Sequence, residues 1–358
     1  MIAVIADDIT GAAEMAGIAH RLGLRVKLTV EPAEAPGCDV IVVATDTRSM
    51  CESEAAAESR RVASALASMP DVAHIFKKTD SALRGHVVAE LEAIISATPY
   101  TKALYIPANP SKGRIIRDGV YYVGDKPIHE TDFSFDPEFP AFSSKMAERF
   151  PGCEVKGIEY ADAVNEDDMV HAVSSAGNST ILAGAADLFT AFLKHYLPVD
   201  GARKTETFTL DTTDTLIVCG STQSKPIDCG IETLYMPTTL YNGETTADSW
   251  ADELEKEYDL RHSLILAIRD RHRTGKEIAV HLRETTGHIV RRLVGHHAPS
   301  ELVIEGGATA YAILRKLGWE SFTITHEIAP GVIRMRSDNG THITMKPGSY
   351  PWGGLFAS

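Results

Sequence analysis

The sequence predicts an α/β protein with two domains, each built on its own sheet. Three observations predict this fold class. Short apolar runs alternate with longer helical segments from residue 2 onward, a polar stretch at 198–214 interrupts the alternation, and a second alternation begins at residue 215. Strands and helices that alternate at this spacing form crossover units with a largely parallel sheet, and runs that are apolar on both faces indicate that helices flank the sheet.

The first half contains a regular series of expected elements. We expect strands at 2–6, 26–30, 39–45, 73–78 and 103–108, helices at 11–22, 52–68 and 84–96, and a further strand and helix within 179–195. Residues 109–150 are rich in Pro, Gly, Phe and Asp and show little periodicity. Turn-forming residues of this kind predict extended loops, with one hairpin at 119–128.

The second half is expected to form a mixed α/β sheet with Gly-rich turns. Strands are expected at 215–221 and 264–268, a helix at 275–294, and a strand followed by a helix at 301–318. The tail at 322–349 alternates polar and apolar residues, as antiparallel strands do. The polar stretch at 198–214 is the candidate linker. We therefore predict an N-terminal domain over 1–205 and a C-terminal domain over 206–358.

The composition excludes several classes of protein. The 358 residues carry 49 acidic and 35 basic side chains, a net charge of −14, which opposes general affinity for nucleic acid or an anionic membrane. No apolar run approaches the roughly 20 residues of a membrane helix, and no basic region precedes the first strand. The five cysteines are scattered without CxxC pairing, which favours reduced thiols. We expect a cytoplasmic protein with small-molecule ligands.

The stretch ADDITGA places two adjacent carboxylates, Asp7 and Asp8, at the end of the first buried strand. Ligands of open parallel sheets bind beyond the carboxyl ends of the strands. A single Asp in this position could simply cap the next helix, which begins near Thr10 and Gly11. A cap needs only one carboxylate, however, and a pair suits proton abstraction from a hydroxyl or binding of polyol hydroxyls. We expect one Asp to cap the helix and the other to meet a hydroxyl group.

Charged residues also follow two further strand ends. The segments TDTRS (45–49) and KKTDSALRGH (77–86) supply Asp46, Arg48, Lys77, Lys78, Asp80, Ser81 and Arg84. An Arg fork suits a carboxylate or phosphate, and Lys acts as a point charge. Either segment alone could be an exposed charged loop. Because successive strands tend to be neighbours, the three strand ends together predict one pocket for an anion and hydroxyl groups.

The segment PANPSKGRIIRDG (107–119) could add a fourth contribution to this pocket. It combines Asn109, Lys112 and Arg114 with turn-forming Pro and Gly residues. A basic loop of this kind could close over a ligand, or it could be solvated surface.

Three Gly-rich turns follow strands of the second half. They contain Gly220 and Ser221, then Gly306 and Gly307, and finally Lys346 and Gly348. Glycine lets the backbone approach a ligand closely, and a helix N-terminus favours phosphate. Tight packing of strand against helix would explain a single Gly-Gly pair equally well, and neither a P-loop nor a GxGxxG fingerprint is present. Three such turns together favour a cradle for nucleotide phosphates.

These motifs resemble the four-carbon acid sugar kinase family, formerly a domain of unknown function. The resemblance rests on ADDITGA, KKTDSALRG, PANPSKGR…DGVYYV and the late order GGATA…APGV…KPGS, which cover nearly the whole chain. It implies an N-terminal domain that binds a sugar acid such as threonate, erythronate or an oxo-tetronate. It also implies a C-terminal domain that binds ATP and delivers its γ-phosphoryl group to a substrate hydroxyl.

The resemblance also implies particular site residues. The substrate site would be lined by Asp7, Asp8, Arg48, Lys78, Asp80, Ser81 and Arg84, with Asp8 and Asp80 as candidates for the catalytic base. The nucleotide would meet Ser221, Gly306, Gly307, Thr309 and Gly348. Mg²⁺ would bridge the nucleotide phosphates and needs few protein ligands. The histidines lack a ligand-like set of companions, so no protein metal site is expected.

Two departures from the family pattern leave an alternative open. Ala308 follows the two glycines, where the family usually has an acidic residue, and Tyr350-Pro351-Trp352 intervene in the last turn. The alternative is a non-catalytic sugar-acid-binding or regulatory protein with a degenerate nucleotide domain. An isomerase or aldolase acting on the same acids is a further alternative, which the lack of a His/carboxylate metal cluster disfavours. The antiparallel tail could form part of a homodimer contact.

Overall fold

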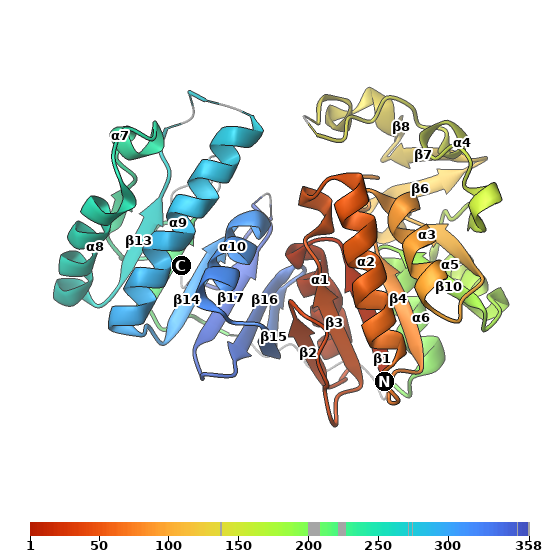
Figure 1. The fold of residues 1–358 in the computed structure, drawn as a ribbon, viewed down its shortest axis with the longest axis horizontal. Helices are drawn as coiled ribbons and strands as arrows, with labels where there is room; N and C mark the ends of the chain where they lie inside the picture. Colours follow the sequence, from red (N-terminus) through yellow and green to blue (C-terminus); the bar gives the residue numbers. More distant parts are fainter. Residues whose placement is uncertain are drawn as a thin grey trace. The chain divides into compact units, whose positions relative to one another are not determined.

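The computed structural model describes residues 1–136, 138–199, 208–220, 227–270, 272–273, 275–348 and 350–356. The chain divides into two compact units, Met1–Arg203 and Lys204–Ser358. Each unit is a sheet with helices packed on it, which confirms the predicted α/β fold class (Figure 1). The predicted boundary between residues 205 and 206 lies outside the described residues.

The first unit is built on a parallel sheet. Its strands lie in the order β2 (Val26–Thr29), β3 (Val40–Ala44), β1 (Ile2–Ala6), β4 (His74–Lys78), β10 (Thr180–Gly184), β5 (Lys102–Ile106) and β9 (Ile158–Tyr160). Every residue of β1 and β3 is buried, because helices cover the sheet on both faces. The chain runs from β1 to β2 and β3 on one side and then crosses to β4 on the other, so the strand order reverses at β1.

Helices α1 (Ile9–Arg21), α5 (Glu166–Ser175) and α6 (Ala186–Tyr196) pack in one layer, and α2 (Glu52–Ala67) packs on α3 (Val87–Ala97) in the other (Figure 1). Their starting points differ from the predicted ones for local reasons. Helix α1 begins at Ile9 because Asp8 caps it, and α3 begins only at Val87 because Leu83 and Gly85 have φ values of 64° and 95°. A positive φ interrupts a right-handed helix.

The loop-rich region of the first unit contains a small antiparallel sheet. It joins β6 (Arg114–Arg117), β7 (Val120–Val123) and β8 (Lys126–Pro127), which confirms the predicted hairpin at 119–128 and adds one strand. Short helical segments, η3 (Ile128–Glu130), η4 (Asp132–Phe135) and α4 (Met146–Arg149), follow it.

The second unit has a mixed sheet. Its order is β12 (Thr233–Tyr235), β13 (Leu264–Ala267), β11 (Thr215–Cys219), β14 (Glu301–Glu305), β17 (His342–Lys346), β16 (Val332–Ser337) and β15 (Ser321–Ala329). Neighbours from β12 to β17 are parallel, and β17, β16 and β15 form an antiparallel meander, which confirms the predicted antiparallel tail.

Helices and a C-terminal segment cover the second sheet. Helix α9 (Lys276–His297) packs between α8 (Ala247–Arg261) and α10 (Gly307–Leu317), and α7 (Thr238–Tyr241) follows β12. On the core side, Ile217 and Val303 pack with Leu355 and Trp352 from the end of the chain. Across the residues that the structure describes, no helix combines the length and apolar character that a bilayer crossing requires.

Candidate functional site

The candidate substrate site lies where three neighbouring parallel strands end. Asp7 and Asp8 follow β1, Arg48 lies in the short helix η1 (Thr47–Ser49) that follows β3, and Asp80 lies in the loop after β4. The backbone N–H of Arg48 donates to the carbonyl of Asp7 at 3.1 Å, which joins the first two strand ends. The strand order reverses at β1, and such reversal points are where open α/β sheets bind ligands.

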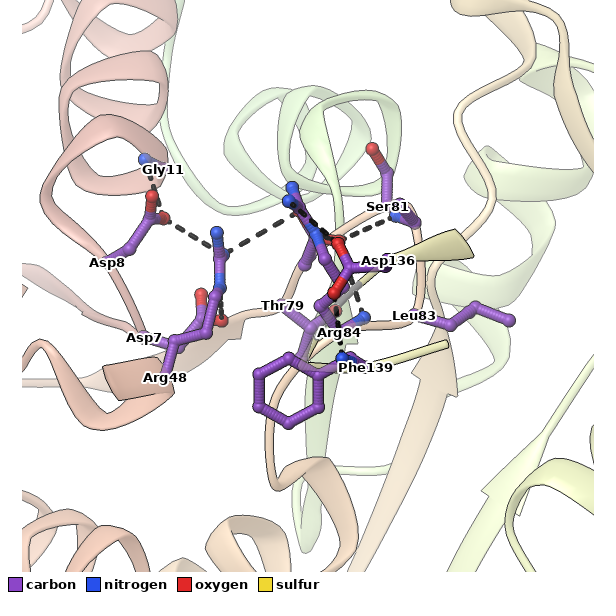
Figure 2. A network of polar contacts seen from close by, with 12 residues as sticks. Asp7, Asp8, Gly11, Arg48, Thr79, Ser81, Leu83, Arg84, Asp136 and Phe139 are labelled. Atoms are coloured by element: carbon purple, nitrogen blue, oxygen red, sulfur yellow. Dashed lines mark hydrogen bonds and ion pairs between the residues drawn. The ribbon is translucent and has the colours of Figure 1, made fainter. Parts of the chain in front are cut away.

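Arg48 is the centre of this site. Its Nε donates to Oδ2 of Asp7 at 2.8 Å and its Nη2 to Oδ1 of Asp8 at 3.0 Å (Figure 2). The same Nη2 lies 3.7 Å from Oδ1 of Asp80. Burial alone would lower the pKa of Arg48, but the three carboxylates raise it well above its ordinary value. The guanidinium therefore holds three strand-end carboxylates together.

Asp8 caps helix α1, as was expected of one Asp of the pair. Its Oδ1 accepts from the N–H of Gly11 at 2.9 Å, and its Oδ2 accepts from the hydroxyl of Thr10. Burial raises the pKa of Asp8, but Arg48, Lys78 and the Thr10 hydroxyl outweigh it and hold the pKa below its ordinary value. The cap does not isolate Asp8 from the site, because its side chain is 17% exposed, against 4% for Asp7.

Asp80 organises the loop that carries it. Its two oxygens accept from Nε and Nη2 of Arg84 at 2.8 and 2.9 Å, and Oδ2 also accepts from the N–H of Ala82 at 2.9 Å. Burial raises the pKa of Asp80, but Arg48 and Arg84 outweigh it and hold the pKa far below its ordinary value. The buried Leu83 in this loop has a φ of 64°, a conformation that bulky residues rarely adopt. Asp80 thus stabilises a strained loop that carries Ser81 and Arg84.

Lys78 and Ser81 complete the predicted substrate set. Lys78 is buried at the end of β4, where its Nζ donates to the carbonyl of Thr79 at 2.9 Å and lies 3.8 Å from Glu14. Ser81 accepts a hydrogen bond from Arg114 through its hydroxyl and another from Tyr121 through its carbonyl. The structure therefore brings together all seven residues that the family resemblance assigned to this site. It does not bring Lys77 there, because Lys77 lies within β4 and pairs with the buried Glu90.

Residues that the sequence did not single out tie the loops to this site. Glu14 joins helix α1 to the basic loop, because its Oε1 accepts from Lys112 at 2.6 Å. Asp136 lies 3.8 Å from Nη1 of Arg84 (Figure 2). Phe139 packs edge-on against His86. Glu14 could have been predicted from the sequence, because it stands one helical turn after Thr10. Asp136 could not have been predicted, because it lies in the aperiodic Phe- and Pro-rich loop.

The three carboxylates of this network, Asp7, Asp8 and Asp80, are matched by the three cations Arg48, Lys78 and Arg84. Within the described part of the chain, Nη1 of Arg48 has no hydrogen-bond or ion-pair partner. An incoming carboxylate can bind such a donor, and ligand hydroxyls can donate to the carboxylates. The arrangement suits a small anion that also carries hydroxyl groups.

The second candidate site lies where β11, β14 and β17 end side by side. The N–H of Gly220 donates to the carbonyl of Glu305 at 3.2 Å, and the N–H of Gly306 donates to the carbonyl of Lys346 at 3.0 Å. Gly306 has a φ of 103° and precedes helix α10, whose N-terminus no described side chain caps. Gly220 and the turn that follows β17 therefore lie beside one uncapped helix N-terminus, which favours an anion.

Close packing requires glycine at one position of this second site. A Cβ on Gly220 would lie 2.2 Å from Oγ1 of the buried Thr309, so only glycine fits there. Gly307 begins helix α10 and Gly348 lies in the turn after β17. Ser221, which was also predicted to meet the nucleotide, lies outside the described residues.

Comparison with known proteins identifies two family domains in the chain. Residues 2–152 match a family domain described as a sugar-binding N-terminal domain, and residues 235–350 match one described as a nucleotide-binding C-terminal domain. The chain belongs to the four-carbon acid sugar kinase family. This confirms the family resemblance of the sequence motifs.

Curated relatives carry the names of sugar acid kinases. The chain is 25% identical to the D-threonate kinase of Salmonella typhimurium in an alignment that covers 91% of this chain and 89% of that protein. It is 36% identical to the D-threonate kinase of Bordetella bronchiseptica over 153 residues, which cover 40% of this chain and 38% of that protein.

Solved structures show the same fold. A Haemophilus influenzae protein of the DUF1537 family aligns with a TM-score of 0.72 and 18% identity over 99% of this chain and 98% of that chain. A Salmonella typhimurium LT2 protein aligns with a TM-score of 0.78 and 18% identity over 99% of this chain and 97% of that chain.

Proposed function

We propose that the chain is an ATP-dependent kinase that phosphorylates a hydroxyl group of a four-carbon sugar acid of the threonate, erythronate or oxo-tetronate type. The observation that carries the proposal is the network of three carboxylates and three cations at the reversal point of the first sheet. A sugar acid combines a carboxylate, which the cations can bind, with hydroxyls, which can donate to the carboxylates. The names of the curated relatives support the same substrate class.

In this proposal the cations bind charge and an Asp accepts the hydroxyl proton. Arg48, Lys78 and Arg84 bind the substrate carboxylate and the charge that develops on the transferred group. Phosphoryl transfer requires mainly such positioning and charge stabilisation from the protein. Asp8 is the favoured base, because its side chain is 17% exposed against 10% for Asp80, whose two oxygens both accept from Arg84. Asp80 then acts by holding Ser81 and Arg84 in place.

The proposed phosphoryl donor is ATP, held by the Gly-rich turns of the second unit. The N-terminus of α10, which begins at Gly307, supplies backbone N–H groups of the kind that bind phosphate, and Gly220, Gly306 and Gly348 let the neighbouring backbone lie close to it. The described residues contain no cluster of His, Cys, Asp and Glu that would hold a metal ion by itself. Mg²⁺ fits the proposal as an ion carried by the nucleotide phosphates, which keeps several of its waters.

A coupled assay of ADP release across a panel of four-carbon acids tests this function. At least one acid should stimulate ADP release in a saturable manner, above the rate with ATP and Mg²⁺ alone. If ATP and an acid both bind but no acid stimulates release, the chain is the non-catalytic sugar-acid-binding protein that Ala308 and the altered last turn left open.

The conservative substitution Asp8→Asn tests the proposed base. It keeps the acceptor for the Gly11 N–H but removes the basic carboxylate, so kcat should fall by about 10²- to 10⁴-fold. Asp80→Asn serves as the comparison and should act mainly through KM and stability. Normal turnover by the Asp8→Asn variant would exclude Asp8 as the base.

A further inference from the structure

Lys346 is a buried lysine in the second unit that the proposed chemistry does not use. It is the last residue of β17 and heads the Gly-rich turn KPGSYPWGG. From the sequence alone, a lysine beside such a turn suits a phosphate ligand, as lysine does in P-loops. Its side chain, however, is only 2% exposed.

The contacts of Lys346 satisfy its donors within the chain. Its Nζ forms an ion pair with Oε1 of Glu305, which is itself 5% exposed. The same Nζ lies 3.2 Å from the carbonyl of Pro347 and 3.3 Å from that of Gly348. The ring of Trp352 lies 4.8 Å from it. An ammonium group has three N–H donors, and three acceptors surround this one, so no donor is left for a phosphate.

These contacts connect two sides of the candidate nucleotide site. Glu305 is the last residue of β14 and directly precedes Gly306 and helix α10, whereas Pro347 and Gly348 form the turn after β17. The backbone of Lys346 adds a second connection, because its carbonyl accepts from the N–H of Gly306. Lys346 therefore fixes the turn at 347–348 against the start of α10.

We propose that the Glu305–Lys346 ion pair is a positioning device for the nucleotide site and that Lys346 is not a phosphate ligand. The pair holds the Gly348 turn at the N-terminus of α10, so that backbone N–H groups of both segments point to one anion. This inference rests on the proposed binding of ATP to the second unit. Trp352, one of the residues that depart from the family pattern, takes part in the device, since its ring covers the ammonium group.

The same strand offers a matched control at its other end. Glu301, the first residue of β14, is 6% exposed and pairs with Arg334 of β16 at 2.8 Å. This second pair is also buried and also joins β14 to a neighbouring part of the sheet, but it lies at the edge away from the Gly-rich turns. If the effect of a substitution came only from breaking a buried ion pair, it should be the same at the Glu305–Lys346 pair and at the Glu301–Arg334 pair.

Titration of ATP into the full-length chain and its variants, with thermal unfolding in parallel, tests the proposal. Lys346→Met should weaken ATP binding by about tenfold or more while adenosine binding changes little. Arg334→Met should lower the melting temperature yet leave the ATP affinity of the folded protein unchanged. Equal loss of ATP affinity in both variants, or no loss in Lys346→Met, would overturn the proposal.

The partner residue separates positioning from direct phosphate binding. If Lys346 bound phosphate, Glu305→Met would free it and ATP binding would stay the same or become tighter. Positioning predicts weaker binding instead, because the turn loses its anchor. Should Glu305→Met fail to fold, Glu305→Gln keeps an acceptor for Lys346 and should bind ATP more weakly than the unaltered chain. Unchanged or tighter binding of ATP by Glu305→Gln would count against positioning.

If the unaltered chain binds no ATP, the proposed function itself fails. That result differs from normal ATP binding by the variants, which would overturn only the role of the ion pair.

Discussion

The two candidate sites lie at the carboxyl ends of parallel strands but are built from different parts of the chain. In the first unit, charged side chains form the site, with Arg48 between Asp7, Asp8 and Asp80. In the second unit, backbone at Gly220, Gly306 and Gly348 forms the site, and its main charged pair is buried inside the turns.

This difference indicates what each site can discriminate. Side chains of both signs can distinguish a carboxylate from a hydroxyl, which a sugar acid requires of its binding site. Backbone N–H groups and a helix N-terminus bind phosphate with little regard for the rest of the ligand. The first site should therefore be sensitive to changes of charge, and the second to changes of backbone conformation and packing.

The largest expected effect is that of Arg48→Met on the first unit. The substitution leaves three carboxylates near one another without their shared cation, and breaking a buried pair in this way costs about 3–5 kcal/mol. Urea unfolding should show this loss in the free energy of unfolding. Arg25→Met is the control, because the Arg25–Asp39 pair is largely exposed and should contribute little. Similar losses in the two variants would contradict the role of Arg48.

A smaller effect is expected of Gly220→Ala in the second unit. The added Cβ would lie 2.2 Å from Oγ1 of Thr309, whose branched side chain has little freedom to move. Overpacking of this kind costs about 1–3 kcal/mol and should also weaken ATP binding, as calorimetry can measure. Gly295→Ala in helix α9 is the control, because among the described residues no heavy atom outside the adjoining helix backbone lies within 4 Å of the added Cβ. A neutral Gly220→Ala would show that this turn tolerates a side chain.

Acidification should affect the first site through Asp8 and Asp80. The pKa values of both lie below the ordinary 3.8 of an Asp side chain. A carboxyl whose pKa is lowered by folding stabilises the fold fully above its unfolded pKa, and this contribution is lost as the pH falls. The free energy of unfolding should therefore decrease below about pH 4. Asp80→Asn should show a shallower decrease in the same titration, and an equally steep one would contradict the assignment.

Much of the first site was predictable because its residues lie at strand ends. Apolar runs placed the strands, and the residues after them, including Asp7, Asp8 and Asp80, then had to share one edge of a parallel sheet. The helix cap at Asp8 was predictable from local sequence for a similar reason. Both inferences depend on short stretches of chain, in which the hydrophobic periodicity and the helix-capping preference of the residues determine the local structure.

Other parts depended on contacts between distant segments. Glu305 and Lys346 are 41 residues apart, and nothing in either turn indicates that they pair. Asp136 approaches Arg84 from a loop without periodicity, so sequence could not place it. Helix α8, by contrast, could have been predicted from its own sequence. Its buried Trp250, Leu254 and Tyr258 recur every four residues, as on one face of a helix, but this helix was not among the predicted elements.

Separate titrations of threonate and ATP into the Arg48→Lys variant test the central claim, that the sugar acid and the nucleotide bind to different units. This variant keeps the positive charge but loses the planar fork that contacts Asp7 and Asp8 together. We predict that threonate binding weakens by about tenfold or more while ATP binding is unchanged. Loss of ATP binding in this variant, or threonate binding equal to that of the unaltered chain, would contradict the account.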